Sequence, residues 1–362
     1  MRSTKFARQL NIWIDRLSLT REDPDPQANG IMDGRMGRAL IYAVAYRYSG
    51  QAVFESKAQQ LLNYITDQIG NEDLLNFGCG ITGIGWAIEW LAQNKFIIEN
   101  TDEILADIDD EIYKSVIYGK SPSLSRNTGT LGKALYFYSR NQSENPGTPR
   151  YKTIANLECL ILLIDEIKEQ LFDEEKGLLR NNESTGVMPS LPPEDIENMA
   201  DSLIFLSTLS GSRIYPEVTT MIVKGIISFT GKLDREEWAH LLNESSDRQL
   251  VKAYLKLCYA FYFAGCMFRR PGWQLQGKAM FDSLTVNGNK GIYDQPVIAE
   301  LFGRFYCSTG SARYLSLLEK SIDIDRYLDA GRISPLDGAR VFLTLMSIQK
   351  PQIPNCAGIL LL

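Results

Sequence analysis

A pair of glycines separated by two residues recurs along the chain, and each pair opens an apolar stretch. The pairs are Gly34/Gly37, Gly80/Gly83 and Gly129/Gly132, which lie 46 and 49 residues apart. In every copy a small residue follows the second glycine and precedes a large apolar one. Repeats of this length are typical of stacked helical hairpins, since one hairpin cannot bury its apolar face alone. The chain is therefore predicted to be all-α, with hairpins of about 47 residues.

The same phase continues downstream, where an aspartate rather than a glycine precedes each apolar stretch. These aspartates are Asp201, Asp247, Asp294 and Asp337, spaced 46, 47 and 43 residues apart. The longer step before Asp201 contains residues 172–195, which are rich in Glu, Asn, Ser, Gly and Pro. Such a composition predicts an inserted loop. We therefore expect seven units in a single domain, residues 1–362.

Amphipathic stretches alternate with these apolar ones. A helix that is apolar on all sides is buried, whereas a one-sided helix covers the outside. The pattern predicts seven inner and seven outer helices that close into an α/α toroid, with the first outer helix beside the last inner helix. Thr101 is expected to cap the third outer helix. The outer helices are predicted at 4–19, 53–69, 102–118, 151–171, 216–230, 274–285 and 312–321.

Composition excludes several classes of protein. Lys and Arg number 38 against 44 Asp and Glu, a net charge of −6, which argues against a nucleic-acid partner. The chain contains no run of 18 apolar residues and does not begin with a signal peptide, so we expect no membrane partner and a cytoplasmic location. The six cysteines form no CxxC pair, which favours reduced cytosolic thiols.

The glycine-led stretches and the seven hairpins resemble the lanthionine synthetase C-like family, the lanthipeptide cyclases. The ending is similar too: an inner helix at 334–348, a proline-containing turn and the apolar tail 358–362. The resemblance covers the whole chain and is strongest in the first 140 residues, in segment 77–91 above all. It implies an α/α toroid. In the cyclases of this family, two cysteines and a histidine hold one zinc ion, which activates a peptide thiol for addition to a dehydrated residue.

The chain departs from the family at the zinc ligands. Where a Cys-His-Gly triplet opens the sixth inner helix of the family, this chain reads Asp294-Gln295-Pro296. Where the other cysteine opens the fifth, it reads Asp247-Arg248. A thiolate-rich zinc site needs soft ligands that converge on one point. We therefore expect no metal and no cofactor. The alternative zinc ligands that the chain offers are Cys258, Cys307 and its only histidine, His240.

The N-termini of the inner helices converge on one end of such a ring, its mouth, and this defines the candidate site. One explanation of the aspartates is helix capping, because Asp accepts hydrogen bonds from the free N–H groups of a first turn. Another explanation is general acid–base catalysis by carboxylates that lie around the funnel at this mouth. The candidate catalytic residues are Asp33, Asp201, Asp247, Asp294 and Asp337, and the candidate ligand-binding residues are Arg35, Cys79, Arg248 and Gln295.

Three functions are open at this point, and the sequence does not decide whether the chain is an enzyme. The resemblance favours an accessory or maturation factor that binds a ribosomally made peptide in the funnel, without zinc-dependent cyclisation. Its partners would be a precursor peptide or a peptide-modifying enzyme. The second hypothesis is a carbohydrate-active enzyme, a glycosidase or lyase, that uses the mouth carboxylates; it rests on fold analogy. The third is a non-catalytic interaction scaffold.

Overall fold

The computed structural model describes residues 4–19, 29–32, 34–71, 74–179, 191–232, 247–286, 295–322 and 335–352, and every structural statement below refers to these. Every regular element within them is a helix. The chain divides into two compact units that each draw on several segments of sequence. Unit 1 comprises Met1–Ile112, Gln142–Thr148 and Tyr293–Leu361, and unit 2 comprises Tyr113–Asn141, Pro149–Ile292 and Leu362. A single domain for the whole chain stays a prediction.

Seven helices, which we call the inner set, are buried along much of their length. Residues 81–87, for example, are all buried. A helix that is buried on every side needs apolar residues on every side, and the repeated apolar stretches of the sequence have such residues. The inner set is α2 (Arg35–Ser49), α4 (Ile81–Gln93), α7 (Thr130–Asn141), α9 (Pro193–Thr208), α12 (Arg248–Met267), α14 (Pro296–Thr309) and α17 (Pro335–Gln349).

The helices between them, the covering set, bury one side only. Two short 3-10 helices extend α3 and α9, at Ile69–Asn71 and Leu209–Gly211. None of the described helices is both long and apolar enough to cross a membrane. The covering set is α1 (Thr4–Leu19), α3 (Ala52–Gln68), α5 (Thr101–Ile104), α6 (Ala106–Ile117), α8 (Arg150–Phe172), α10 (Pro216–Lys232), α13 (Pro271–Val286) and α15 (Ala312–Ser321). The predicted alternation is therefore confirmed.

One covering segment differs from its prediction. The segment predicted as a single helix at 102–118 is divided into α5 and α6. Asn100, not Thr101, is the N-cap, because the Asn100 side chain accepts a hydrogen bond from the Asp102 backbone N–H at 3.1 Å. Thr101 is buried, and its hydroxyl accepts a hydrogen bond from the Asn145 side chain at 2.7 Å. Asn and Thr are both good caps, so residue type alone did not decide between neighbours.

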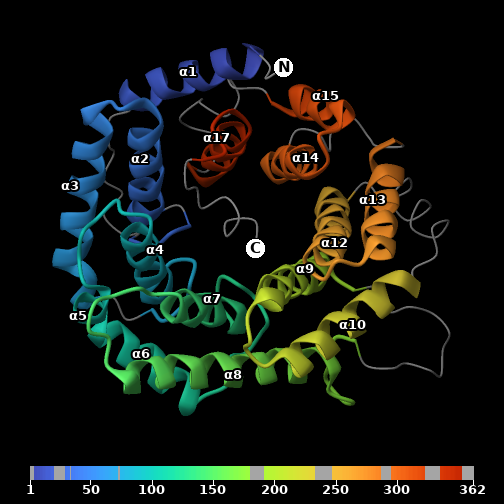
Figure 1. Ribbon diagram of the computed structural model, residues 1–362, viewed down its shortest axis with the longest axis horizontal. Coiled ribbons are helices and arrows are strands. Elements are labelled where there is room, and N and C mark those ends of the chain that lie inside the picture. The colour runs from blue at the N-terminus through green and yellow to red at the C-terminus, as the bar shows by residue number, and fades with distance from the viewer. Residues whose placement is uncertain are drawn as a thin grey trace. The chain divides into compact units, whose positions relative to one another are not determined.

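In unit 1 the two ends of the helical repeat meet. Helix α17 packs on α14, α2 and α1 (Figure 1). The ring of Trp13 in α1 stacks on Phe342 in α17, with 4.5 Å between the ring centroids. The Lys350 ammonium, just after α17, donates to the backbone carbonyl of Tyr48 in α2 at 2.9 Å. The first covering helix thus lies beside the last inner helix, as the sequence predicted.

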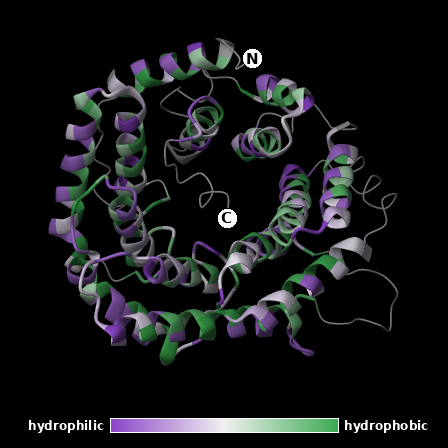
Figure 2. Cartoon of the chain, in the orientation of Figure 1, coloured by the Kyte–Doolittle hydropathy of each residue, from purple (hydrophilic) through white to green (hydrophobic). Residues whose placement is uncertain are grey.

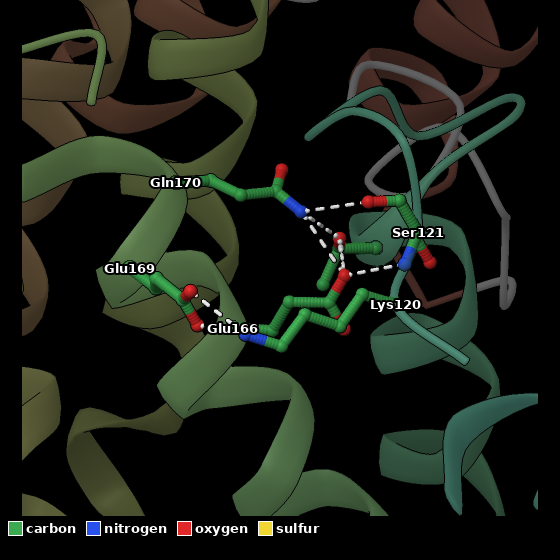
Figure 3. A network of polar contacts seen from close by, with 6 residues as sticks. Lys120, Ser121, Glu166, Glu169 and Gln170 are labelled. Atoms are coloured by element: carbon green, nitrogen blue, oxygen red, sulfur yellow. Dashed lines mark hydrogen bonds and ion pairs between the residues drawn. The ribbon is translucent and has the colours of Figure 1, made fainter. Parts of the chain in front are cut away.

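In unit 2 a buried polar network fixes the loop before α7. The Glu166 carboxylate on α8 accepts hydrogen bonds from the Ser121 backbone N–H at 2.7 Å and the Thr130 hydroxyl at 3.0 Å (Figure 3). The Gln170 side chain, one turn later, donates to the Thr130 hydroxyl at 2.9 Å and to the Ser121 carbonyl at 3.2 Å. A buried carboxylate needs such partners. The network therefore holds α7 against its covering helix.

The repeated glycines allow a loop to fold back onto the helix that it precedes. A Cβ atom at Gly37 would collide with the Ile31 carbonyl oxygen, and one at Gly83 with the Phe77 carbonyl oxygen. The atoms that lie closest to these glycines are thus backbone atoms of the preceding loop. Backbone hydrogen bonds that span seven residues close this bend at matching positions before α4 and α7, from the Ile81 N–H to the Leu74 carbonyl (2.8 Å) and from the Thr130 N–H to the Ser123 carbonyl (3.0 Å). Before α2, the Gly37 N–H donates to the Gly30 carbonyl at 3.3 Å.

We predict that Gly83→Ala lowers the free energy of unfolding by about 1–3 kcal/mol, because the new methyl group must displace backbone. Urea unfolding followed by circular dichroism measures the change. The matched control is Gly70→Ala, since no atom lies within 4 Å of a Cβ placed at Gly70. Equal stability of the two variants would contradict the assignment of Gly83 to a close backbone contact.

Candidate functional site

The structure places six of the nine predicted site residues. Asp33 and Asp294 lie outside the described residues. Asp337 lies in the first turn of α17, where the structure describes the backbone but not the side chain. Five of these six residues lie just before or at the start of an inner helix, and the sixth, Asp201, lies within one. They are Arg35 and Cys79 near the starts of α2 and α4, Asp201 in α9, Asp247 and Arg248 at the start of α12, and Gln295 before α14.

Asp247 is a helix cap. Its carboxylate accepts hydrogen bonds from the backbone N–H groups of Gln249 at 2.9 Å and Leu250 at 3.3 Å. Two first-turn donors of α12 are satisfied in this way, and the negative charge faces the positive end of the helix dipole. The capping explanation therefore holds for Asp247. Arg248, the first residue of α12, is exposed beside it.

The prediction that a helix begins at Asp201 is wrong. Helix α9 begins eight residues earlier, at Pro193, and Asp201 lies two turns inside it. Proline in the first turn, followed by Glu194 and Asp195, is a strong helix start. Those residues fall within the segment that composition assigned to a loop, so the true start was hidden. Asp201 is buried and cannot cap α9.

The Asp201 carboxylate instead forms an ion pair with Lys256 of α12, and both side chains are buried. One turn earlier on each helix, Lys252 and Glu197 form a second pair at 2.7 Å, in a more open position. The two pairs form a ladder between α9 and α12. Burial lowers the pKa of Lys256, the charge of Arg126 lowers it further, and Asp201 opposes both effects.

Arg35 and Cys79 have different surroundings. The buried Arg35 guanidinium donates to the Asn29 side chain at 2.9 Å and lies over the Tyr64 ring, 4.2 Å from its centroid. Its partners thus come from its own chain. Cys79 is exposed, and its backbone N–H donates to the Asn76 side chain at 2.7 Å. Gln295 is the N-cap residue of α14, without a side-chain capping bond.

A second buried ion pair joins inner helices that the sequence analysis did not connect. Glu300 of α14 is buried and lies 3.1 Å from Arg304 on its own helix and 3.7 Å from Arg340 of α17. The available signal was a charge inside an apolar inner stretch, since such a residue is rarely buried unless it is paired. The same signal marked Lys256. In both cases the identity of the partner depends on which helices are neighbours.

The described side chains do not fit a thiolate-rich zinc site. Cys258 is buried, which raises the pKa of its thiol and disfavours the thiolate that binds zinc, whereas Cys307 is exposed. At the helix starts where the resemblance places ligands, the chain carries the capping carboxylate of Asp247 and the amide of Gln295. His240 lies outside the described residues. Across the described ranges, no three His, Cys, Asp or Glu side chains are grouped as metal ligands would be.

Comparison with known proteins identifies the fold. A solved structure named nisin cyclase matches with a TM-score of 0.61 and 13% sequence identity, over 99% of this chain and 96% of that one. The chain has the nisin cyclase fold. This is an α/α toroid, so the predicted fold class is confirmed, and the resemblance to lanthipeptide cyclases is confirmed at the level of the fold. No protein-family model matches the sequence, and no curated protein does.

We predict opposite results for two Asp→Asn substitutions. Asp201→Asn leaves Lys256 charged and buried without its counter-ion, which costs about 3 kcal/mol at pH 7. Asp247→Asn is nearly neutral, because Asn caps a helix as well as Asp does. Urea unfolding of both variants measures the difference, and equal effects would contradict the assigned roles.

The cost of Asp201→Asn is expected to shrink between pH 7 and pH 9.5. The pKa of Lys256 is already lowered by burial and falls further without Asp201, so folded Lys256 loses its proton while unfolded lysine keeps it. The folded state then binds fewer protons, and its stability relative to the unfolded state rises with pH. A cost that is constant or grows with pH would contradict a buried, charged Lys256.

We also predict that the purified protein holds no stoichiometric zinc. Elemental analysis checks the zinc content, and a chelator such as EDTA should leave the melting temperature unchanged, because no metal-binding energy is lost. One tightly held zinc per chain would overturn this prediction. Cys258, Cys307 and His240 would then be the first ligands to substitute.

Proposed function

We propose that the protein is a lanthionine synthetase C-like accessory or maturation factor. It binds a ribosomally made peptide at the N-terminal ends of its inner helices and does not carry out zinc-dependent cyclisation. The observation that carries the proposal is the combination of the nisin cyclase fold over nearly the full chain with a capping aspartate and an amide at the helix starts expected to hold zinc ligands.

The start of α12 offers suitable chemistry for a peptide. Asp247 and Arg248 are adjacent, exposed and opposite in charge. A peptide presents backbone hydrogen-bond donors and acceptors together with positively and negatively charged side chains. Hydrogen bonds in which one partner is charged are stronger than hydrogen bonds between neutral groups. The guanidinium of Arg248 suits a peptide carboxylate or carbonyl, because its donors have a fixed planar geometry.

The carbohydrate-active alternative has less support. Glycoside cleavage uses a pair of carboxylates that differ in environment and act as acid and base or nucleophile. Asp201 is ion-paired with Lys256 inside the helix layer, and Asp247 is engaged by backbone N–H groups. Two of the five candidate carboxylates thus have structural roles that compete with acid–base chemistry.

The proposal is tested by selecting binders to the purified full-length chain from a displayed library of linear peptides of about 30 residues. Enriched sequences are resynthesised with a fluorophore, and their dissociation constants are measured by fluorescence anisotropy. We predict specific enrichment, and about a fivefold loss of affinity for Arg248→Ala through loss of a charge-assisted hydrogen bond.

The matched control is Arg313→Ala on covering helix α15, which removes an exposed arginine far along the sequence from the start of α12. It should leave the affinity unchanged. Enrichment no greater than that on empty resin, or an equal effect of both arginine substitutions, would contradict peptide binding at the helix starts and favour the interaction-scaffold hypothesis.

A further inference from the structure

Helix α8 buries one apolar face and also exposes several large apolar side chains on its outer face. Its inner face is buried through Cys159, Leu160, Leu163, Ile164, Ile167 and Leu171. Its outer face exposes Tyr151 (68%), Ile154 (55%), Leu157 and Leu162. Figure 2 shows hydrophobic residues along much of α8. Apolar side chains gathered on an exposed face mark an interaction surface more often than single exposed ones do.

The outer face has the spacing of a helix–helix contact. Positions 151, 154, 158, 161 and 165 are separated alternately by three and four residues, so they form one stripe along α8. Tyr151, Ile154 and Ile161 are the apolar members, while Glu158 and Asp165 carry charge. Ile161 and Asp165 are half-buried, and the Asp165 carboxylate accepts a hydrogen bond from the Tyr215 hydroxyl at 3.4 Å. The exposed part of the stripe, along which a second helix can pack, is therefore residues 151–158.

We propose that two copies of this chain pair through α8, with their α8 helices antiparallel about a two-fold axis near Ile154. A two-fold interface must be self-complementary, because every contact between one residue of the first copy and another residue of the second copy occurs twice, with the copies exchanged. Arg150 and Glu158 lie four residues before and four residues after Ile154. In this pairing each Arg150 faces the Glu158 of the other copy, so the charge pattern selects a second copy as the occupant.

The same register completes an apolar centre. Ile154 meets its own counterpart, and Tyr151 of each copy lies opposite Leu157 of the other. The two Arg150–Glu158 pairs then form part of a polar rim around that centre. The two helices overlap only over residues 150–158 of each copy, about two and a half turns, because α8 begins at Arg150. A contact of this length buries less than the roughly 800 Å² per partner of a standard interface, so the dimer is weak and reversible.

Sedimentation velocity of the full-length chain between about 1 and 200 μM tests the pairing. The wild type should shift from monomer to dimer as its concentration rises. Ile154→Glu should weaken association at least tenfold, because two carboxylates would meet at the axis. The matched control is Leu275→Glu on α13, an exposed leucine (70%) outside the α8 surface, which should associate like the wild type. Unchanged melting temperatures show that both variants fold.

A charge-reversal cycle tests the register. Arg150→Glu and Glu158→Arg should each weaken association, by about fivefold, and the double variant should recover it because opposite charges again face each other. A wild type that stays monomeric throughout, Ile154→Glu that associates like the wild type, or a double variant without recovery would overturn the proposal. These substitutions do not touch the start of α12, so the outcome is independent of peptide binding.

Discussion

The constraint on which the rest of the structure depends is the close return of a loop onto the first turn of an inner helix. At Gly37 and Gly83 the carbonyl oxygen of a residue six positions upstream occupies the space that a side chain would need. Glycine is the residue that permits this approach. Because the bend is closed by backbone hydrogen bonds in three copies, it sets where α2, α4 and α7 begin. It thereby also sets the positions of Arg35 and Cys79.

The later inner helices lack these glycines and begin in other ways. Helix α12 has the capping Asp247, while α9 and α14 have a proline in the first turn. Buried ion pairs then join neighbouring helices, Asp201 with Lys256 and Glu300 with Arg340. Such pairs add little net stability, because desolvation offsets much of the attraction. They do favour one register, since sliding α12 by one turn along α9 would keep one pair of the ladder and leave one lysine and one carboxylate without partners.

This difference explains what could be predicted from the sequence and what could not. The glycine motif and the hydrophobic period predicted the hairpins, the closing contact of α1 with α17 and the toroid class, because each is a local pattern repeated many times. The start of α9 was missed because Pro193 stands in a polar stretch that resembled a loop. Lys256 lies 55 residues from Asp201, and only the packing of α12 on α9 brings them together.

The same contacts bear on how a cyclase fold persists when the zinc ligands are replaced. In the cyclases that the chain resembles, the zinc ligands open two inner helices, so metal-binding energy is also folding energy. Here the start of α12 is held by hydrogen bonds to Asp247, and its depth against α9 by the ladder of Lys252 and Lys256. A helix start that is held in this way keeps its position without a bound metal, so the fold does not need metal-binding energy there.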